Sequence, residues 1–139
     1  QRQVYCNKPK GVFPMLNHEP LRLADGEYRF ACLVWDNEPL PSGQLVALAA
    51  EGLGWKKSTT YTVLKKLCER GVLQNADGRV TSLIKKEDVQ QAESAAVVDK
   101  TFDGSLPRFV AAFLNSKPIS DAEAAEIRAL LDAARYKEE

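Results

Sequence analysis

Residues 55–71 read W-K-K-S-T-T-Y-T-V-L-K-K-L-C-E-R-G, and this stretch has the period of an amphipathic helix. On a helix from Ser58 to Arg70, four side chains recur at the i, i+3, i+4 and i+7 positions of one face. These are Thr60, Val63, Leu64 and Leu67. We expect this face to be buried, with Ser58 capping the helix and Gly71 ending it.

The opposite face of this helix and its flanks carry hydroxyls near the helix start and cations further along. Helix starts rich in Ser and Thr bind phosphate and reach base edges, and Lys can neutralise phosphate or donate to guanine. A solvated surface helix would look similar, so the helix alone leaves both interpretations open. The DNA-binding candidates on it are Lys56, Lys57, Ser58, Thr59, Tyr61, Thr62, Lys65 and Lys66.

The neighbouring segments favour DNA binding. Before the helix, an apolar helix from Ser42 to about Glu51 leads into the glycine turn Glu51–Gly54. After it, Val72-Leu73, a turn at Asn75–Gly78 and Arg79-Val80 suit a hairpin with a basic tip. Helix, turn, helix and hairpin in that order predict a winged helix-turn-helix. Arg79 is the wing residue that we expect to contact the minor groove or phosphate.

A further helix is expected at the start of this domain, from about Asp25 to Asn37. Tyr28, Cys32 and Trp35 give it an apolar stripe, and we expect Trp35 to be a core anchor. Two prolines then make Asn37–Pro41 a turn, since neither can continue a helix.

Charge divides the chain although its formal net charge is zero. Residues 1–85 hold 12 Lys+Arg and 8 Asp+Glu, a net of +4, and residues 86–139 hold 7 and 11, a net of −4. A basic front and an acidic back suit a DNA-binding domain at 21–85, followed by a domain that does not touch the polyanion. A difference this small also arises by chance, so it only supports the motif argument.

Residues 1–20 are expected to form an N-terminal arm, in which three prolines and a glycine interrupt any helical period. The arm is either flexible or packed on the body or a partner subunit, and its apolar side chains favour packing. The cysteines Cys6, Cys32 and Cys68 form no C-x-x-C pair and His18 is the only histidine, so no metal or cofactor is expected. Without an apolar run long enough to span a bilayer or a signal-peptide pattern, we expect a cytoplasmic protein with no membrane insertion.

Residues 86–139 predict three helices: Glu87 to about Lys100, a second between Asp103–Ser105 and Lys117-Pro118, and a third opened by the capping box Ser120–Glu123. They carry more large apolar side chains than three short helices can bury alone, which implies a partner. The alternative is a compact cap folded onto the first domain. The dimerisation candidates are Phe102, Leu106, Phe109, Val110, Phe113, Leu114, Ile127, Leu130 and Leu131.

Six segments carry a resemblance to a known family: Leu23–Trp35, Gly54-Trp55, Ser58–Gly71, Gly78-Arg79, Phe102–Leu106 and Ser120–Glu123. In order and spacing they resemble the penicillinase-repressor family of winged-helix transcriptional regulators, from about Leu21 to the C-terminus. The resemblance implies a mainly α fold with a small β-wing, in which a winged helix-turn-helix domain precedes an α-helical dimerisation domain at 86–139. It implies a homodimeric repressor on double-stranded DNA, and two-fold symmetry predicts a palindromic, inverted-repeat operator.

The sequence departs from the family pattern at several positions. Ala24 replaces the usual capping Thr, so Asp25 is expected to cap instead, and the wing is shorter than usual. The C-terminal cysteine cluster of copper-responsive members is missing. Antibiotic-responsive members are cut between an Asn and a Phe by a membrane-bound sensor-protease. The matching bond, Ala112–Phe113, keeps the Phe and lacks the Asn, so proteolytic induction stays open.

Two other function classes compete with the repressor interpretation. A winged helix can act as a protein–protein interaction module without binding DNA, and a salt-dependent shift of a palindromic duplex would separate the two. An enzyme is disfavoured because the sequence offers no nucleophile–base pair, phosphate loop or metal-ligand cluster.

Overall fold

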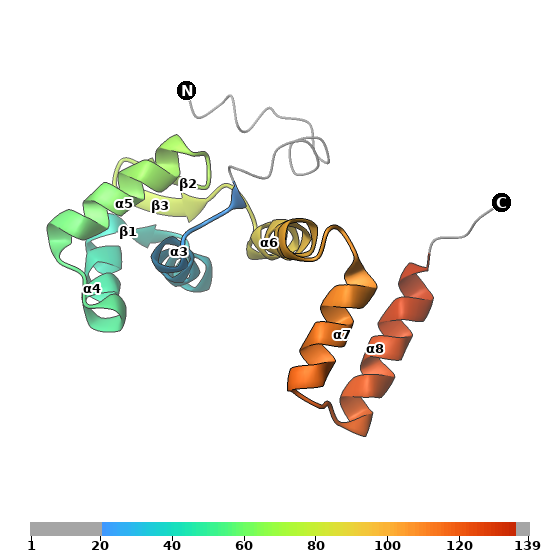
Figure 1. The fold of residues 1–139 in the computed structure, drawn as a ribbon. Coiled ribbons are helices and arrows are strands. Elements are labelled where there is room, and N and C mark those ends of the chain that lie inside the picture. Colours follow the sequence, from blue (N-terminus) through green and yellow to red (C-terminus); the bar gives the residue numbers. More distant parts are fainter. Residues whose placement is uncertain (1–20, 136–139) are drawn as a thin grey trace. The chain divides into compact units, whose positions relative to one another are not determined.

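Helices make up most of the fold, and a small antiparallel sheet lies in its first half (Figure 1). The structure is a computed structural model that describes residues 21–135, so the expected arm at 1–20 lies outside the described residues. The elements are α3 (Asp25–Asn37), β1 (Leu40–Pro41), α4 (Ser42–Leu53), α5 (Lys57–Glu69), β2 (Leu73–Ala76), β3 (Arg79–Ser82), α6 (Lys86–Thr101), α7 (Leu106–Ser116) and α8 (Asp121–Ala134). They confirm the predicted fold class.

The chain forms two compact units, which divide between Ala96 and Val97 inside α6. The first part of α6 therefore belongs to the unit that holds the winged helix, and its Val89 and Ala92 join that unit's core. The boundary expected from composition, at residues 85 and 86, lies at the start of the same helix.

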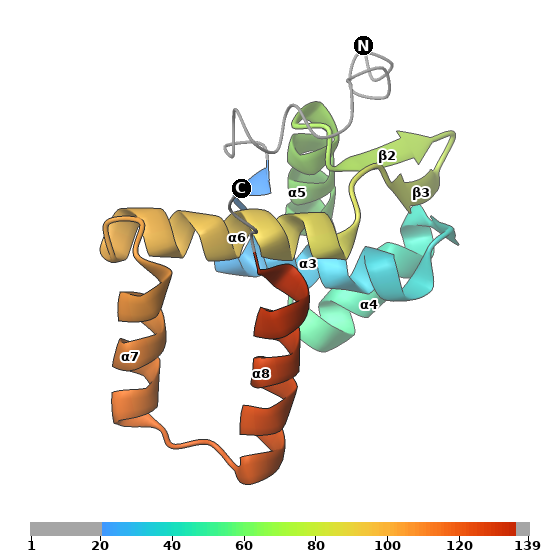
Figure 2. The same ribbon diagram turned by 90° about the vertical axis from the view of Figure 1, so that its right-hand side faces the viewer.

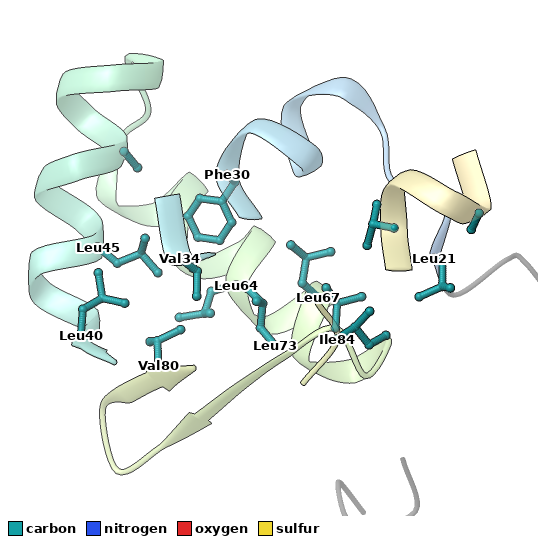
Figure 3. Packing of buried hydrophobic residues seen from close by; sticks show 14 residues of the cluster. Leu21, Phe30, Val34, Leu40, Leu45, Leu64, Leu67, Leu73, Val80 and Ile84 are labelled. Atoms are coloured by element: carbon teal, nitrogen blue, oxygen red, sulfur yellow. The ribbon is translucent and has the colours of Figure 1, made fainter. Parts of the chain in front are cut away.

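One apolar core holds the first unit together (Figure 3). Phe30 and Val34 from α3 are fully buried, as are Leu45 from α4, Leu67 from α5 and Val80 from β3. Burying a side chain of this kind is worth about 1.5–3 kcal/mol. The side chains that α5 buries in this core recur at helical spacing, so they lie on one face of the helix. The opposite face of α5 is therefore the one exposed to solvent.

The start of α3 differs from the prediction. Ala24, not Asp25, stands at the N-cap position, and the side chain of Glu27 reaches back to accept the backbone N–H of Ala24 at 2.8 Å. This is the carboxylate half of a capping box, so Asp25 is not needed as a cap. Further along, the half-buried Trp35 indole packs against the edge of the core and donates to the carbonyl of Ile84 at 2.9 Å. The expected stripe of Tyr28, Cys32 and Trp35 is only half-buried, because the buried apolar side chains of α3 are Phe30, Ala31 and Val34.

The helix-turn-helix consists of α4, a turn and α5. Gly54 ends α4 with a φ of 71°, a conformation that L side chains rarely adopt. The predicted cap at Ser58 is wrong, because α5 begins at Lys57 and places Ser58 in its first turn. The predicted end is confirmed. Gly71 has a φ of 81° and donates to the Cys68 carbonyl, and the next N–H donates to Leu67, which is a Schellman motif.

The wing is a three-stranded sheet in the order β1-β3-β2. Asp77 and Gly78, with φ of 55° and 82°, join β2 to β3 as a two-residue turn of the type that matches strand twist. Strand β1 lies within the segment expected to be a plain turn, so that expectation was incomplete. Leu40 is buried opposite Val80, and the edge position tolerates Pro41.

In the second unit, α7 and α8 run in opposite directions, joined by residues 117–120 (Figure 2). Both predicted starts are confirmed. The Ser105 hydroxyl accepts from the N–H of Arg108, and Ser120 and Glu123 form a reciprocal capping box. Neither helix has a buried residue in the single chain.

Candidate DNA interface

The face of α5 that points away from the core is exposed in the described part of the chain. Thr60, Leu64 and Leu67 are buried and Val63 is half-buried, as the sequence period predicted. The exposed side chains lie on the opposite face and at the helix start, over a helix about 20 Å long at 1.5 Å per residue. They are Lys56, Lys57, Ser58, Thr59, Tyr61, Thr62, Lys65, Lys66 and Glu69.

The N-terminus of α5 suits an anion. The Thr60 N–H makes the first bond of the helix, to the Lys56 carbonyl at 2.9 Å, so the preceding turn's N–H groups lack helical partners. Among the described residues no side chain caps this end. Lys56 and Lys57 add positive charge beside the positive end of the helix dipole.

Two hydroxyls on this surface are already engaged within the protein. Thr62 Oγ1 donates to the Ser58 carbonyl at 2.9 Å, which fixes its rotamer while leaving its oxygen lone pairs and methyl group exposed. The Tyr61 hydroxyl lies 3.1 Å from Ser42 Oγ, so it links α5 to the start of α4. Thr62 therefore presents a fixed acceptor and a methyl group, whereas Tyr61 is partly a structural contact.

Lys66 is placed differently from its neighbour Lys65. Its ammonium lies 2.9 Å from Glu27 Oε2, and the Arg70 guanidinium lies 3.1 Å from Glu27 Oε1. Arg70 also donates to the Arg22 carbonyl. Within residues 21–135, Lys65 has no ion-pair partner. Lys66 therefore lies along the surface towards the carboxylate from α3, whereas Lys65 extends into solvent.

Glu27 is the carboxylate on which this arrangement depends, and sequence analysis did not single it out. It is buried in the fold at 8% exposure. Burial alone would raise the pKa of Glu27, but the Lys66 ammonium, the Ala24 N–H and the Arg70 guanidinium outweigh it, so its pKa lies below the ordinary value. A Glu three residues after a helix N-cap was the one available signal, and it indicates only a cap.

Arg79 opens β3 and is exposed, next to the wing turn, so it is available for a DNA contact. The turn itself carries Asp77, also exposed, which places a negative charge two residues before Arg79. A phosphate approaching the tip would meet both charges, so the wing is a weaker anion site than the start of α5.

The dimerisation candidates lie mostly on an uncovered surface. Phe102 and Phe109 are half-buried and their rings pack edge to face at 5.5 Å. The other seven form what we term the α7–α8 apolar surface: Leu106 (51% exposed), Val110 (41%), Phe113 (49%), Leu114 (40%), Ile127 (42%), Leu130 (68%) and Leu131 (55%). So much apolar exposure in a single chain is typical of an interaction surface.

The Ala112–Phe113 bond lies inside α7, and both residues are exposed. A protease binds its substrate in an extended conformation, so cleavage here requires local unfolding of α7. In the part of the chain that the structure describes, no His, Cys, Asp or Glu side chains group as metal ligands. No helix among the described residues has the length and hydropathy to cross a bilayer.

Comparison with known proteins agrees with this architecture. The family model described as penicillinase repressor matches residues 23–133. The chain is 23% identical over 115 residues to the penicillinase repressor of Bacillus licheniformis, covering 80% of this chain and 90% of that protein. It is 18% identical over 121 residues to the methicillin resistance regulatory protein MecI of Staphylococcus aureus (strain Mu50 / ATCC 700699), covering 84% and 98%. Because the family model spans the winged helix and the helices after it, this chain belongs to the penicillinase repressor family.

Proposed function

We propose that the chain is a transcriptional repressor that binds an inverted-repeat operator as a homodimer, with α5 of each subunit in the major groove of one half-site. The observation that carries this proposal is the face of α5. Its apolar side is committed to the core, and the other side leaves Lys56, Lys57 and Lys65 exposed beside exposed hydroxyl side chains. The family's description as a penicillinase repressor supports the same direction.

Within this proposal the residues of α5 divide by chemistry. Lys56, Lys57 and the exposed N–H groups of the first turn bind the phosphate backbone and set the register of the helix. Thr62 and Lys65, further along, meet base edges, because a Thr offers an acceptor and a methyl and a Lys donates to guanine. The charge of Lys65 also neutralises phosphate beside the groove. Arg79 adds a contact from the wing to the adjacent backbone.

The α7–α8 apolar surface supplies the two-fold contact in this proposal. A dimer places two copies of α5 on one duplex, and the linked contacts raise affinity well above that of one half-site. Bound across a promoter, the dimer blocks transcription by occupying the site. Loss of the dimer would then release the DNA, and a sensor-protease that cut Ala112–Phe113 would act in this way by dividing α7.

A selection experiment followed by a salt titration tests the proposal. The protein selects duplexes from a random-sequence library, and binding to a selected duplex is measured at rising KCl. Lys65→Ala should lower the slope of log affinity against log salt by about 1 per subunit, because one cation that neutralises phosphate is lost. The matched control is Lys117→Ala, an exposed lysine of the second unit, which should leave the slope unchanged.

Failure to enrich any duplex, or binding that does not respond to salt, would contradict the proposal and favour a module that binds protein. An equal slope for Lys65→Ala and wild type would remove this part of α5 from the interface.

A further inference from the structure

Two adjacent lysines on α5 have different surroundings. Lys65 points to solvent, whereas the Lys66 ammonium lies 2.9 Å from Glu27 of α3. From sequence alone both are equivalent candidates for contact with DNA. The difference arises because α3 places the buried Glu27 carboxylate at the flank of α5 where Lys66 lies, and not at the face that carries Lys65.

Glu27 does more than balance one charge. One of its oxygens accepts from Arg70 Nη1 at 3.1 Å and from the Ala24 N–H at 2.8 Å, and the other pairs with Lys66. Lys66 and Arg70 are one helical turn apart, so a single carboxylate holds two successive turns near the end of α5. Arg70 extends the link to the Arg22 carbonyl.

We infer that Glu27 and Lys66 are positioning residues for DNA recognition: their ion pair fixes the orientation of α5 on the domain, and Lys66 makes no contact with the phosphate backbone. The inference rests on the proposed DNA-binding function and deepens it. Apolar burial is non-directional, so on its own it leaves a helix a small freedom to slide along its axis or rotate. A directional ion pair at its flank removes that freedom, so it contributes to reading bases more than to general attraction.

The charge balance supports this division. Glu27 has two cations within 3.1 Å, so removal of Lys66 leaves its largely buried carboxylate paired with Arg70 and with the Ala24 N–H. Lys66 is itself 60% exposed, so the pair is partly solvated and its strength is modest. A small change in how α5 is held is therefore expected, and not a loss of folding.

The test measures salt slope and sequence preference together. Wild type, Lys65→Ala, Lys66→Ala and Lys66→Arg are titrated with KCl on a duplex selected by wild type and on a random-sequence duplex. Lys66→Ala should keep the wild-type slope on both duplexes, and its preference for the selected duplex should fall roughly two- to fivefold, the range for ion pairs of this exposure. Lys66→Arg, which can still pair with Glu27, should restore the preference.

A slope reduced by about 1 per subunit, as for Lys65→Ala, would show that Lys66 touches phosphate and would overturn the inference. An unchanged slope with unchanged preference would also overturn it, because the pair would then position nothing. A wild-type protein that binds neither duplex would instead refute the proposed function itself. Glu27→Gln, with its folding checked by circular dichroism, provides the second arm. It should lower the preference as Lys66→Ala does, and combining both changes should cause no further loss.

Discussion

Replacing Phe113 with aspartate should separate the proposed dimer into monomers while the first unit stays folded. Phe113 is 49% exposed in the single chain and lies between other members of the α7–α8 apolar surface on the same helix. None of the buried side chains of the winged-helix core comes from this helix. The change therefore acts on the surface that we assign to dimerisation and leaves the core untouched.

The size of the effect follows from exposure. Full burial of a Phe is worth about 1.5–3 kcal/mol, so covering the exposed half is worth about 1 kcal/mol per subunit. A carboxylate held in the same place without a partner costs a further 2 kcal/mol or so. Over two subunits the loss is about 6 kcal/mol, which raises the dimer dissociation constant by roughly 10⁴-fold.

Sedimentation equilibrium measures this constant directly. Both tryptophans, Trp35 and Trp55, lie in the first unit, so their fluorescence reports independently that this unit remains folded. Asn115→Asp is the matched control, because it adds the same charge to α7 two residues further on, across the helix from Phe113. A Phe113→Asp protein that stays dimeric at micromolar concentration would show that the interface lies elsewhere in the chain.

Three further predictions follow from the first unit. Thr62→Ala should reduce affinity for a selected duplex more than for a random one at equal salt, since its exposed methyl and acceptor face away from the core; equal losses would exclude base reading. The free energy of unfolding of wild type should fall as the pH drops below the ordinary glutamate value of 4.5 and through the lower folded pKa of Glu27. In this pH range the Glu27 carboxyl binds a proton more readily in the unfolded chain than in the folded one. Glu27→Gln should therefore weaken the pH dependence of the unfolding free energy measured by urea titration, and an unchanged pH dependence would show that the ion pairs contribute nothing. Gly78→Ala, at a φ of 82°, should destabilise the fold by about 1 kcal/mol, whereas Gly52→Ala in α4, with open space around it, should be neutral or stabilising; equal effects would contradict the turn geometry.

The burial pattern of α5 was predictable because it depends on periodicity, a property of adjacent residues. Thr60, Leu64 and Leu67 recur at the helical period, and any partner surface would have buried the same side. The end of α5 at Gly71 was predictable for the same reason, because it depends only on the backbone conformation of that residue. Signals of this kind survive without knowledge of the tertiary structure.

The partner of Lys66 could not be predicted in the same way. It depends on how α3 packs against α5, because Glu27 lies 39 positions before Lys66 in the chain (66 − 27 = 39). No pattern of adjacent residues indicates such a pair. Strand β1 was missed for a related reason. Two residues, one of them a proline, carry no strand period, and Leu40 becomes a strand residue only because Val80 lies opposite. The start of α5 was shifted by one residue because Ser58 is a good cap that the turn geometry does not use.

The central claim is that α5 of each subunit reads one half of an inverted repeat from the major groove. The most direct measurement replaces each guanine of a selected duplex, in turn, with an analogue that lacks the N7 acceptor, which is exposed only in the major groove. The affinity of the wild-type protein should fall when the replaced guanines occupy positions related by two-fold symmetry. For at least one such pair of positions, the replacement should leave the affinity of Lys65→Ala unchanged. Losses confined to one half of the duplex, or no loss at any guanine, would contradict the account.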